Sequence, residues 1–385
     1  MNISVLGAYQ TKFGELWQKS LEDLFLESCL EAIRDANILK KDIQIIYIGN
    51  KLAGSLSDQN HLSSLLTQIL KINVPVVRVE AACASGGVAV SQACMAIASE
   101  QYETALVVGV EKMTDLLSEN VAQHLMSAAG LDEQDSGLSF VGLYALMAMS
   151  YLQKFKAPRK SLAAPAIKNH FHASLNKKAH FPFCINLAQV LKSPVIAQPL
   201  TLLECSPISD GAAAIVLSSS KFAKKRQLKN GVKIVASSLA NENISLAQRQ
   251  SLLEIKATKK AALQAYNQAG LGPKEISFLE VHDCFTIAEI IALEDLGLYK
   301  KGYGFKALEN GEVKLGGKRP VNLSGGLKGC GHPVGATGVK QIVEVFNQLK
   351  NRAGVRQTKD PKIGLTHNVG GTGGTAVVHI LQKKA

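Results

Sequence analysis

The pattern of hydrophobic and polar positions divides the chain into two kinds of segment. Short apolar runs, many of them rich in Val and Ile, predict strands, and longer stretches with helical periodicity lie between them. This alternation is typical of a mostly parallel sheet covered by helices. The predicted strands are 3–6, 43–48, 75–80, 105–110, 212–217, 232–237, 276–281, 320–323, 362–366 and 375–381. The predicted helices are 21–35, 61–70, 81–99, 252–269, 285–297 and 334–350.

The order of these elements occurs twice along the chain. No repeated sequence accompanies it, so we predict two similar α/β units that share a topology. At 385 residues the chain is also too long for one ordinary core. The regular pattern is lost from about 111 to 200, within the first unit, which indicates an insertion over the mouth of the first sheet. We place the N-terminal half at 1–220, with the insertion at about 111–200, and the C-terminal half at 221–385.

Composition and charge restrict the classes of function. A hydrophobic content of 46% without low-complexity tracts is that of a globular protein. The net charge of +12 suits nucleic acid, an anionic membrane surface or an acidic small molecule. The densest basic run, 221–233, has no interleaved Tyr or Trp, so we interpret it as a solvated connector and expect no nucleic acid partner. The uncharged run 81–99 is too polar for a bilayer span, and no secretory signal is evident, so we expect a cytoplasmic protein.

The cysteines and histidines give little indication of a metal centre. Seven cysteines without Cys-x-x-Cys spacing argue against a disulfide framework or a zinc ribbon. His170 and His172 form an incomplete ligand set, and we interpret their segment as a surface helix. We therefore expect no metal.

Cys83 lies where the strand over 75–80 meets the helix over 81–99. A thiol at a helix N-terminus faces unpaired backbone N–H groups and the positive end of the macrodipole, and both favour the thiolate. Cys83 is thus a candidate nucleophile, although a buried core thiol is the alternative when it is considered alone. The Gly86–Gly87 pair weakens the helix, which indicates close backbone packing against another element.

A second motif, His-Asp-Cys-Phe at 282–285, follows a predicted strand and opens a predicted helix. His282 and Cys284 are two residues apart at the strand end, so both side chains can point into one cleft. The following helix again offers its N-terminus to a thiol. A satisfied core imidazole and a core thiol are the alternatives.

A third motif, 324–338, contains Gly-His-Pro within a glycine-rich loop that leads into a helix. His332 is held just before a proline at the helix start, where it could accept the Cys83 proton or bind a developing oxyanion. The loop lacks the Walker and Rossmann spacings of phosphate sites.

The last glycine-rich segment, 370–374, lies between the final two strands. Such a loop can present backbone N–H groups as an oxyanion hole, with Gly370 and Gly371 as candidates. A tight hairpin in which glycines permit positive φ is the alternative.

With these motifs in view, the chain resembles the thiolase superfamily. The resemblance rests on five motifs in the family's order: Cys-Ala-Ser at 83–85, Gly-Val-Glu-Lys-Met at 109–113, His-Asp-Cys-Phe at 282–285, Gly-His-Pro-Val-Gly-Ala-Thr-Gly at 331–338 and the glycine loop at 370–374. Among thiolases the chain looks like the sterol-carrier-protein type and the archaeal acetoacetyl-CoA enzymes. The resemblance implies the thiolase fold, two βαβαβαββ-type halves in a five-layer α/β/α/β/α sandwich with an inserted loop domain.

The resemblance also implies a ping-pong acyl transfer between CoA thioesters, with no resident cofactor. His332 would activate Cys83, which would form an acyl-enzyme, and Cys284 would remove the α-proton of acetyl-CoA for a Claisen condensation. Thiolytic cleavage of a 3-ketoacyl-CoA, as in fatty acid β-oxidation, is the reverse. His282 and His332 would bind the enolising thioester oxygen, and backbone N–H groups of Cys83 and about Gly370 the acyl-enzyme oxyanion.

Substrate and partner contacts are implied less specifically. Tyr144 and Met147 of the loop domain would hold the pantetheine arm, and basic residues would meet the CoA phosphates. The family suggests a homodimer or homotetramer, with a hydroxymethylglutaryl-CoA synthase assembly in archaeal relatives. One departure is Cys330, which stands where relatives often carry Lys and could alter CoA contacts or oxidation sensitivity.

Two other functions remain open on the sequence. One is a catalytically silent thiolase-fold subunit that binds acyl-CoA within a larger acyltransferase assembly. The other is a ketoacyl synthase acting on carrier-protein substrates, a class that normally lacks a thiol of the Cys284 type. The intact Cys83, His282, Cys284 and His332 favour an active CoA-dependent enzyme.

Overall fold

A computed structural model describes residues 2–228 and 231–383, and Lys229 of the basic run therefore lies outside the described residues. The elements of the N-terminal half alternate as predicted, with the insertion between β4 and β7. They are β1 (Ile3–Gln10), α1 (Leu21–Asp35), β2 (Ile45–Gly49), α2 (Ala53–Leu56), α3 (Leu62–Leu70), β3 (Val76–Val79), α4 (Ser85–Ala98), β4 (Thr104–Glu111), β7 (Gly211–Ser219) and α10 (Ser220–Lys225).

The C-terminal half repeats this order. It contains β8 (Val232–Asn241), α11 (Lys256–Ala269), β9 (Phe278–Glu280), α12 (Thr286–Asp295), α13 (Gly304–Glu309), α14 (Gly326–Cys330), α15 (Val334–Leu349), β10 (Ile363–Gly370) and β11 (Thr375–Gln382). The insertion contains α5 (Ser118–Met126), α6 (Leu131–Asp135), α7 (Phe140–Phe155), α8 (Ala163–Ser174), α9 (Leu187–Lys192), β5 (Val195–Ala197) and β6 (Leu200–Thr201).

The strand order shows the relation between the halves. The N-terminal strands run β3-β2-β4-β7-β1 and the C-terminal strands β8-β11-β10-β9, and β1 pairs with β8 to give one nine-stranded sheet. In the N-terminal half, the edge strand β3 pairs in parallel with β2. In the C-terminal half, Val321 takes the equivalent place and forms a parallel bridge with Leu279 of β9. The predicted repeat of topology at half-chain scale is therefore present.

The predicted strand at 320–323 is wrong as a full strand. Only Val321 forms a bridge, with Leu279 of β9. The chain then turns away because Asn322 adopts a left-handed φ of 59° and its side chain accepts a hydrogen bond from the Val281 N–H at 2.8 Å.

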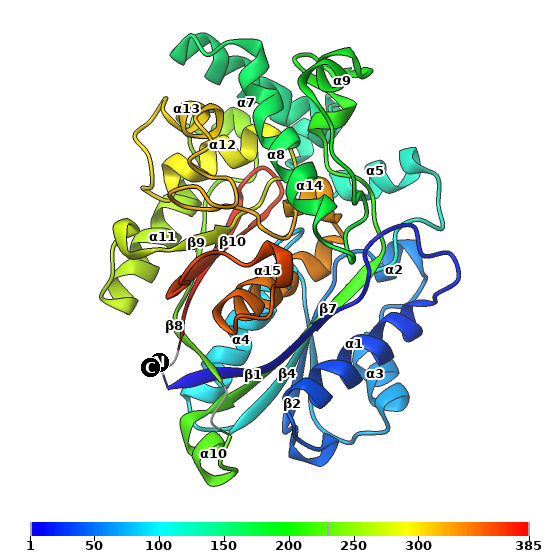
Figure 1. Ribbon diagram of the computed structural model, residues 1–385. Helices are drawn as coiled ribbons and strands as arrows, with labels where there is room; N and C mark the ends of the chain where they lie inside the picture. The colour runs from blue at the N-terminus through cyan, green and yellow to red at the C-terminus, as the bar shows by residue number, and fades with distance from the viewer. Residues whose placement is uncertain (1, 229–230, 384–385) are drawn as a thin grey trace.

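Five layers follow from the packing of helices against this bent sheet. α4 and α15 contact each other and lie between the strands of the two halves, as Figure 1 shows at the centre of the molecule. On the outer faces, α1 contacts the N-terminal strands and α11 the C-terminal strands. The architecture is the predicted α/β/α/β/α sandwich. The inserted helices α7 and α8 lie over the C-terminal half, against α12 and α14 (Figure 1).

Glycines allow the two central helices to meet backbone to backbone. A Cβ on Gly86 would lie 2.5 Å from the Gly335 carbonyl oxygen, and one on Gly338 would lie 2.2 Å from the Gly87 nitrogen. The close approach predicted from the Gly86–Gly87 pair therefore occurs, and it brings the start of α4 against the start of α15.

Asp210, the residue before β7, links the insertion to the rest of the first half through hydrogen bonds. Its buried carboxylate accepts hydrogen bonds from Lys112 Nζ at 2.8 Å, the Met113 N–H at 2.6 Å, the Thr114 N–H at 2.8 Å and the Leu16 N–H at 3.0 Å. Burial alone would raise the pKa of Asp210, but hydrogen bonds from Lys112, Thr114 and the backbone lower it below its usual value. The ionised carboxylate is thus part of the folded structure.

We expect Asp210→Ala to lower the free energy of unfolding by about 3–5 kcal/mol, because it removes the buried partner of Lys112, which keeps only the exposed Asp115 carboxylate, and leaves the N–H groups of Met113 and Thr114 without their acceptor. Urea unfolding at pH 7 measures the change. Because folding lowers the pKa, the wild-type contribution is present above the unfolded pKa and is lost as the pH falls below it. Lys362→Ala, at an exposed ion pair with Asp360, is the control and should cost at most about 1 kcal/mol. Equal losses in the two variants would contradict the prediction.

Candidate active site

The candidate nucleophile lies in a tight turn between β3 and α4. Ala82 adopts a left-handed φ of 52°, and the Ser85 hydroxyl accepts from the Ala81 N–H at 2.9 Å and donates to the Ala82 carbonyl at 2.6 Å. The turn delays the helix, which begins at Ser85 rather than at residue 81. Cys83 is thereby presented at the end of the strand rather than inside a helical turn.

Three of the predicted site residues come together although they are far apart in the sequence. The Cys83 sulfur and ring nitrogens of His282 and His332 all lie within 4.8 Å of one another. The two imidazoles meet edge to face with centroids 5.1 Å apart. Among the described residues, this is the set whose arrangement would suit a soft metal ion, and the same arrangement suits proton transfer between a thiol and an imidazole.

The protonation of His332 follows from its neighbour Thr337. The Thr337 hydroxyl donates to the Pro333 carbonyl at 2.9 Å, so it can only accept from His332 Nδ1, which lies 2.7 Å away. The ring proton of neutral His332 is therefore on Nδ1. Its Nε2 keeps a lone pair, which is what a general base for Cys83 requires.

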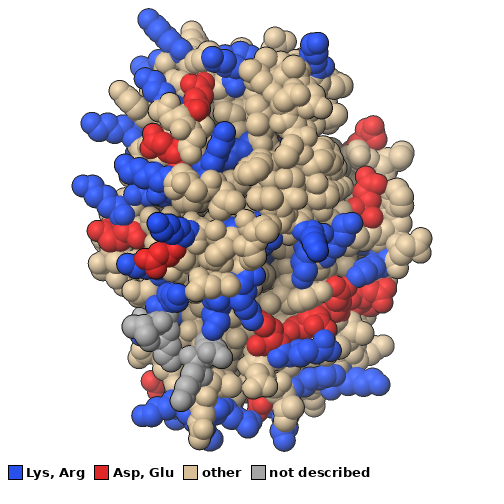
Figure 2. Space-filling view, viewed as in Figure 1, with Lys and Arg blue, Asp and Glu red and all other residues tan. Residues whose placement is uncertain are grey.

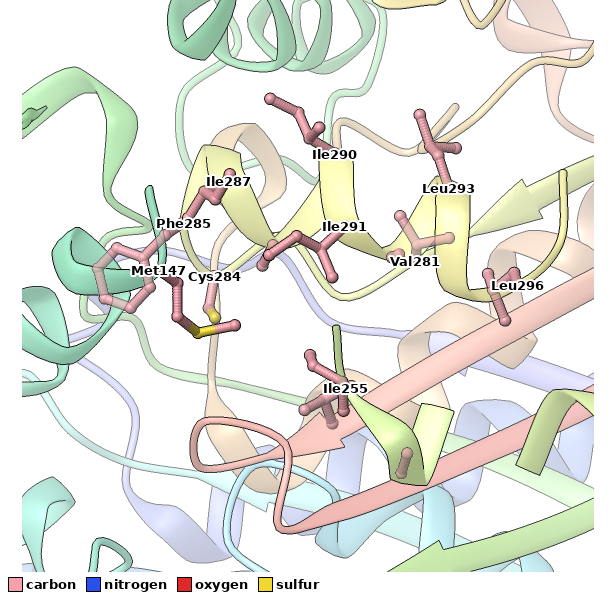
Figure 3. Packing of buried hydrophobic residues seen from close by; sticks show 14 of the residues in the cluster. Met147, Ile255, Val281, Cys284, Phe285, Ile287, Ile290, Ile291, Leu293 and Leu296 are labelled. Atoms are coloured by element: carbon pink, nitrogen blue, oxygen red, sulfur yellow. The ribbon is translucent and has the colours of Figure 1, made fainter. Parts of the chain in front are cut away.

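Cys284 is the fourth predicted residue of the site. It is 7% exposed, just before α12, and the Tyr144 hydroxyl and the Cys83 side chain are among the neighbours that affect its pKa. The Tyr144 hydroxyl also donates to the Gly371 carbonyl at 3.0 Å. Figure 3 shows the Met147 side chain reaching toward Cys284 in the same buried cluster. Tyr144 and Met147 are 1% and 0% exposed, and their contact with a pantetheine arm stays a prediction from the sequence.

The glycine loop joins β10 to β11 beside the nucleophile. The backbone N–H groups of Gly371 and of Cys83 itself are directed at the Cys83 thiol. Gly370 ends β10 and packs so closely that a Cβ there would lie 2.5 Å from the Ala81 carbonyl oxygen. The geometry therefore favours the N–H groups of Cys83 and Gly371 as the oxyanion donors, with Gly370 as the close-packed support.

The protonation state of the Cys83 thiol in the free protein differs from the sequence expectation. Cys83 is half-buried, and burial raises the pKa of its thiol to about 11, although Lys51 and the N–H of Gly371 act in the opposite direction. Burial, with a smaller effect of Lys340, lowers the pKa of His332 to about 3. The expected preference for thiolate is therefore wrong for the free protein, because desolvation outweighs the turn and helix dipoles. The pair rests as neutral thiol and neutral imidazole.

Because Cys83 and His332 are both neutral, we can predict how the reaction of Cys83 with iodoacetamide depends on pH. Since only the thiolate is alkylated, we expect the rate in the free protein to rise about tenfold per pH unit between pH 7 and 10. Mass spectrometry of the Cys83 peptide measures the rate, with exposed Cys184 as the internal reference. A rate that is flat across this range would mean that a thiolate and imidazolium pair is already formed.

Two buried carboxylates position the site and were not identified from the sequence. Asp283 accepts from the Leu327 N–H at 2.7 Å and the Lys328 N–H at 3.2 Å, which links the segment of His282 and Cys284 to the loop before His332. Glu111 accepts from the Gly335 N–H at 2.9 Å and so fixes the start of α15. Asp283 and Glu111 stand within two of the sequence motifs, and that position was the available signal.

Burial bears on two other expectations. Cys330 is 0% exposed, and its sulfur accepts from Gln10 Nε2 at 3.6 Å and Asn176 Nδ2 at 3.7 Å, so it packs inside the fold. The surface helix expected for His170 and His172 is wrong. Both are buried, with Nδ1 3.1 Å from the Phe183 carbonyl oxygen and 2.9 Å from the Asn322 carbonyl oxygen, respectively.

A cleft of about 500 Å³ opens beside the site. Lys51, Ala82, Gly371 and Thr372 are among the residues that line it. Lys and Arg are scattered over much of the face shown in Figure 2 rather than gathered in one stripe. Among the described residues, helices are either too short or too polar to cross a membrane.

Comparison with known proteins agrees with these features. Family models match residues 3–221 (Thiolase, N-terminal domain) and 238–383 (Thiolase C-terminal domain-like). An acetyl-CoA acetyltransferase of Methanothermobacter thermautotrophicus is 44% identical over 99% of this chain and 100% of its own. Sterol carrier protein 2 of Bos taurus is 32% identical over 98% of this chain and 71% of its own.

A solved structure shares the fold. The crystal structure of human mitochondrial 3-ketoacyl-CoA thiolase superposes with a TM-score of 0.76 at 19% identity, covering 100% of this chain and 99% of its own. With family models matching both halves, the chain belongs to the thiolase family.

Proposed function

We propose that the protein is a CoA-dependent acetyltransferase that forms acetoacetyl-CoA from two acetyl-CoA molecules and catalyses the reverse thiolysis. The observation that carries the proposal is the convergence of Cys83, His282 and His332 within 4.8 Å, with Cys284 in electrostatic contact with Cys83. The 44% identity to an acetyl-CoA acetyltransferase supports the substrate. The proposed classification is an acyltransferase of the acetyl-CoA C-acyltransferase and acetyl-CoA acetyltransferase type, with acetyl as the transferred group.

In the first half-reaction, His332 Nε2 accepts the Cys83 proton as the sulfur attacks the thioester carbonyl. The N–H groups of Cys83 and Gly371 hold the oxyanion. The CoA sulfur then leaves with the proton from His332, and an acetyl-Cys83 thioester remains. The high pKa of Cys83 fits this order, because proton transfer accompanies attack instead of preceding it.

In the second half-reaction, Cys284 acts as a thiolate and removes the α-proton of another acetyl-CoA. The enolate carbon bonds to the acetyl carbonyl of acetyl-Cys83, the carbon–sulfur bond to Cys83 breaks to release acetoacetyl-CoA, and the Cys83 sulfur takes the proton from Cys284. Burial is the main cause that raises the pKa of Cys284 well above its usual value, and an ionised Cys83 would raise it further. Once Cys83 is acetylated it cannot ionise, so a thiolate at Cys284 then has no neighbouring thiolate to repel it. The His282 and His332 imidazoles stabilise the enolate oxygen.

We further propose contacts for CoA and for partner chains. The net charge of +12 suits the CoA phosphates, and the reaction as written needs no resident cofactor.

The sheet edge at β3, where Val77 is 43% exposed, supports a homodimer or homotetramer through pairing with another copy. Exposed apolar residues on and beside α9, including Leu191 and Val195, offer a surface for a hydroxymethylglutaryl-CoA synthase-type assembly. The cytoplasmic location stays a prediction from the sequence.

The silent acyl-CoA-binding subunit and the ketoacyl synthase are less well supported. A silent subunit has no need for a general base with a free lone pair beside a cysteine. A carrier-protein synthase has no evident use for the second thiol at Cys284. Identity over whole chains to an acetyl-CoA acetyltransferase also favours the active CoA enzyme.

The test is cleavage of acetoacetyl-CoA by purified protein with added CoA, followed by the loss of enolate absorbance. Acetyl-CoA carrying a labelled acetyl group is used in parallel to detect acetyl-Cys83 by mass spectrometry. Cleavage together with labelling supports the proposal. Binding of acetyl-CoA without labelling would favour a silent subunit, and activity with acyl carrier protein but not CoA would favour a synthase.

A further inference from the structure

Asn368 of β10 is held in one orientation by two backbone groups. Its Oδ1 accepts from the Gly87 N–H at 3.2 Å, and its Nδ2 donates to the Cys83 carbonyl at 3.0 Å. A backbone N–H can only donate and a carbonyl can only accept, so the two ends of the amide cannot be exchanged. The second hydrogen of Nδ2 is left for His282 Nδ1, 3.3 Å away.

This contact determines where neutral His282 carries its proton. Because Asn368 Nδ2 has no lone pair to offer, His282 Nδ1 must accept, and the ring proton is on Nε2. Burial, followed by the neighbouring His332 and His367, keeps the pKa of His282 well below its usual value, so the ring is neutral. His282 Nε2 is buried and has no hydrogen-bond partner among the described residues.

We propose that Asn368 is a positioning residue that holds His282 in the Nε2–H tautomer, so that His282 donates a hydrogen bond to the thioester oxygen of the enolising substrate. This inference rests on the proposed thiolase function and specifies what determines the tautomer of one active-site histidine, His282. The unpartnered donor points to an oxygen acceptor, and the oxygen that gains charge as the enolate forms is the group that would gain most from it.

The two histidines are thereby given opposite properties at the same ring atom. Thr337 leaves His332 Nε2 with a lone pair, and Asn368 leaves His282 Nε2 with a hydrogen. One imidazole can take the proton of Cys83 while the other supplies a donor, without a prior exchange of protons. The hydrogen on His282 Nε2 also opposes binding of a soft metal by Cys83, His282 and His332, since a ligand nitrogen must offer a lone pair.

The direct test is the tautomer of His282 in the free wild-type protein, which needs no activity. Nitrogen-15 NMR of the histidine rings separates N–H nitrogens from nitrogens with a lone pair, and the signals lost in His282→Gln assign the residue. We expect an N–H at Nε2 and a lone pair at Nδ1. The reverse assignment, or a positively charged ring at pH 7, would overturn the inference even if the enzyme proves to be a thiolase.

The variant Asn368→Asp supplies the kinetic test. One carboxylate oxygen can still accept from Gly87, but the other accepts from His282 Nδ1–H, so the hydrogen leaves Nε2. We expect kcat for acetoacetyl-CoA synthesis to fall about 10²-fold, the effect of removing one oxyanion donor. Acetylation of Cys83 by acetyl-CoA should fall less than condensation, because that step uses His332, although the Cys83 carbonyl also loses its donor from Asn368.

Asn267→Asp, on the exposed face of α11, makes the same chemical change away from the site and should keep both activities. Loss of synthesis in Asn368→Asp with an unchanged His282 tautomer would overturn the positioning role. If Asn368→Asp does not fold, the nitrogen-15 spectrum of the wild-type protein still tests the tautomer of His282. Wild-type protein without thiolase activity but with the expected tautomer would count against the proposed function alone.

Discussion

Alanine at Cys83 is expected to abolish both synthesis and cleavage of acetoacetyl-CoA and to remove the acetyl label from the protein. No other described thiol lies within 4.8 Å of both His282 and His332, so no other sulfur can form the acyl-enzyme there. Loss of a nucleophile costs on the order of 10⁶-fold in kcat in a well-studied hydrolase. We expect a fall to the detection limit of the absorbance assay.

Cys94→Ala is the matched control for this variant. Cys94 lies on α4, the helix that follows Cys83, and is 0% exposed within an apolar cluster. Its replacement should cost stability but leave the catalytic rates within about twofold. Residual labelling of Cys83→Ala by acetyl-CoA, at a rate comparable with wild type, would show that the nucleophile lies elsewhere.

Alanine at Cys284 is expected to separate the two half-reactions. The acetyl label on Cys83 should form at a rate near that of wild type, because Cys83, His332 and the N–H of Gly371 are untouched. Condensation should fall by about 10²–10⁴-fold, the usual contribution of a general acid or base. Burst labelling and steady-state synthesis, measured on the same preparation, test both parts.

An exchange experiment isolates the role of Cys284 further. Wild-type protein with acetyl-Cys83 in place should exchange the methyl deuterons of labelled acetyl-CoA with solvent, and Cys284→Ala should not. Tyr144→Phe removes the hydroxyl that contacts Cys284, and its exchange rate should lie between those of wild type and Cys284→Ala. Undiminished exchange in Cys284→Ala would assign the base to another group, with His332 as the first candidate.

The sequence by itself determined the order of elements and the position of the chemistry along the chain. Periodicity located the strands and helices because burial of one face leaves a local signature. Cys83, His282, Cys284 and His332 were identified because each follows a strand or opens a helix within a recognisable motif.

Tertiary structure alone decided how those residues behave. The contacts that fix the tautomers and the pKa values join residues far apart in sequence, such as Asn368 and Cys83, which are 285 positions apart. Desolvation of Cys83, the burial of Tyr144 and the left-handed turn at Asn322 also depend on what packs around them. A local pattern carries no information on such contacts, because a hydrogen bond or a loss of water depends on the partner that the fold brings close.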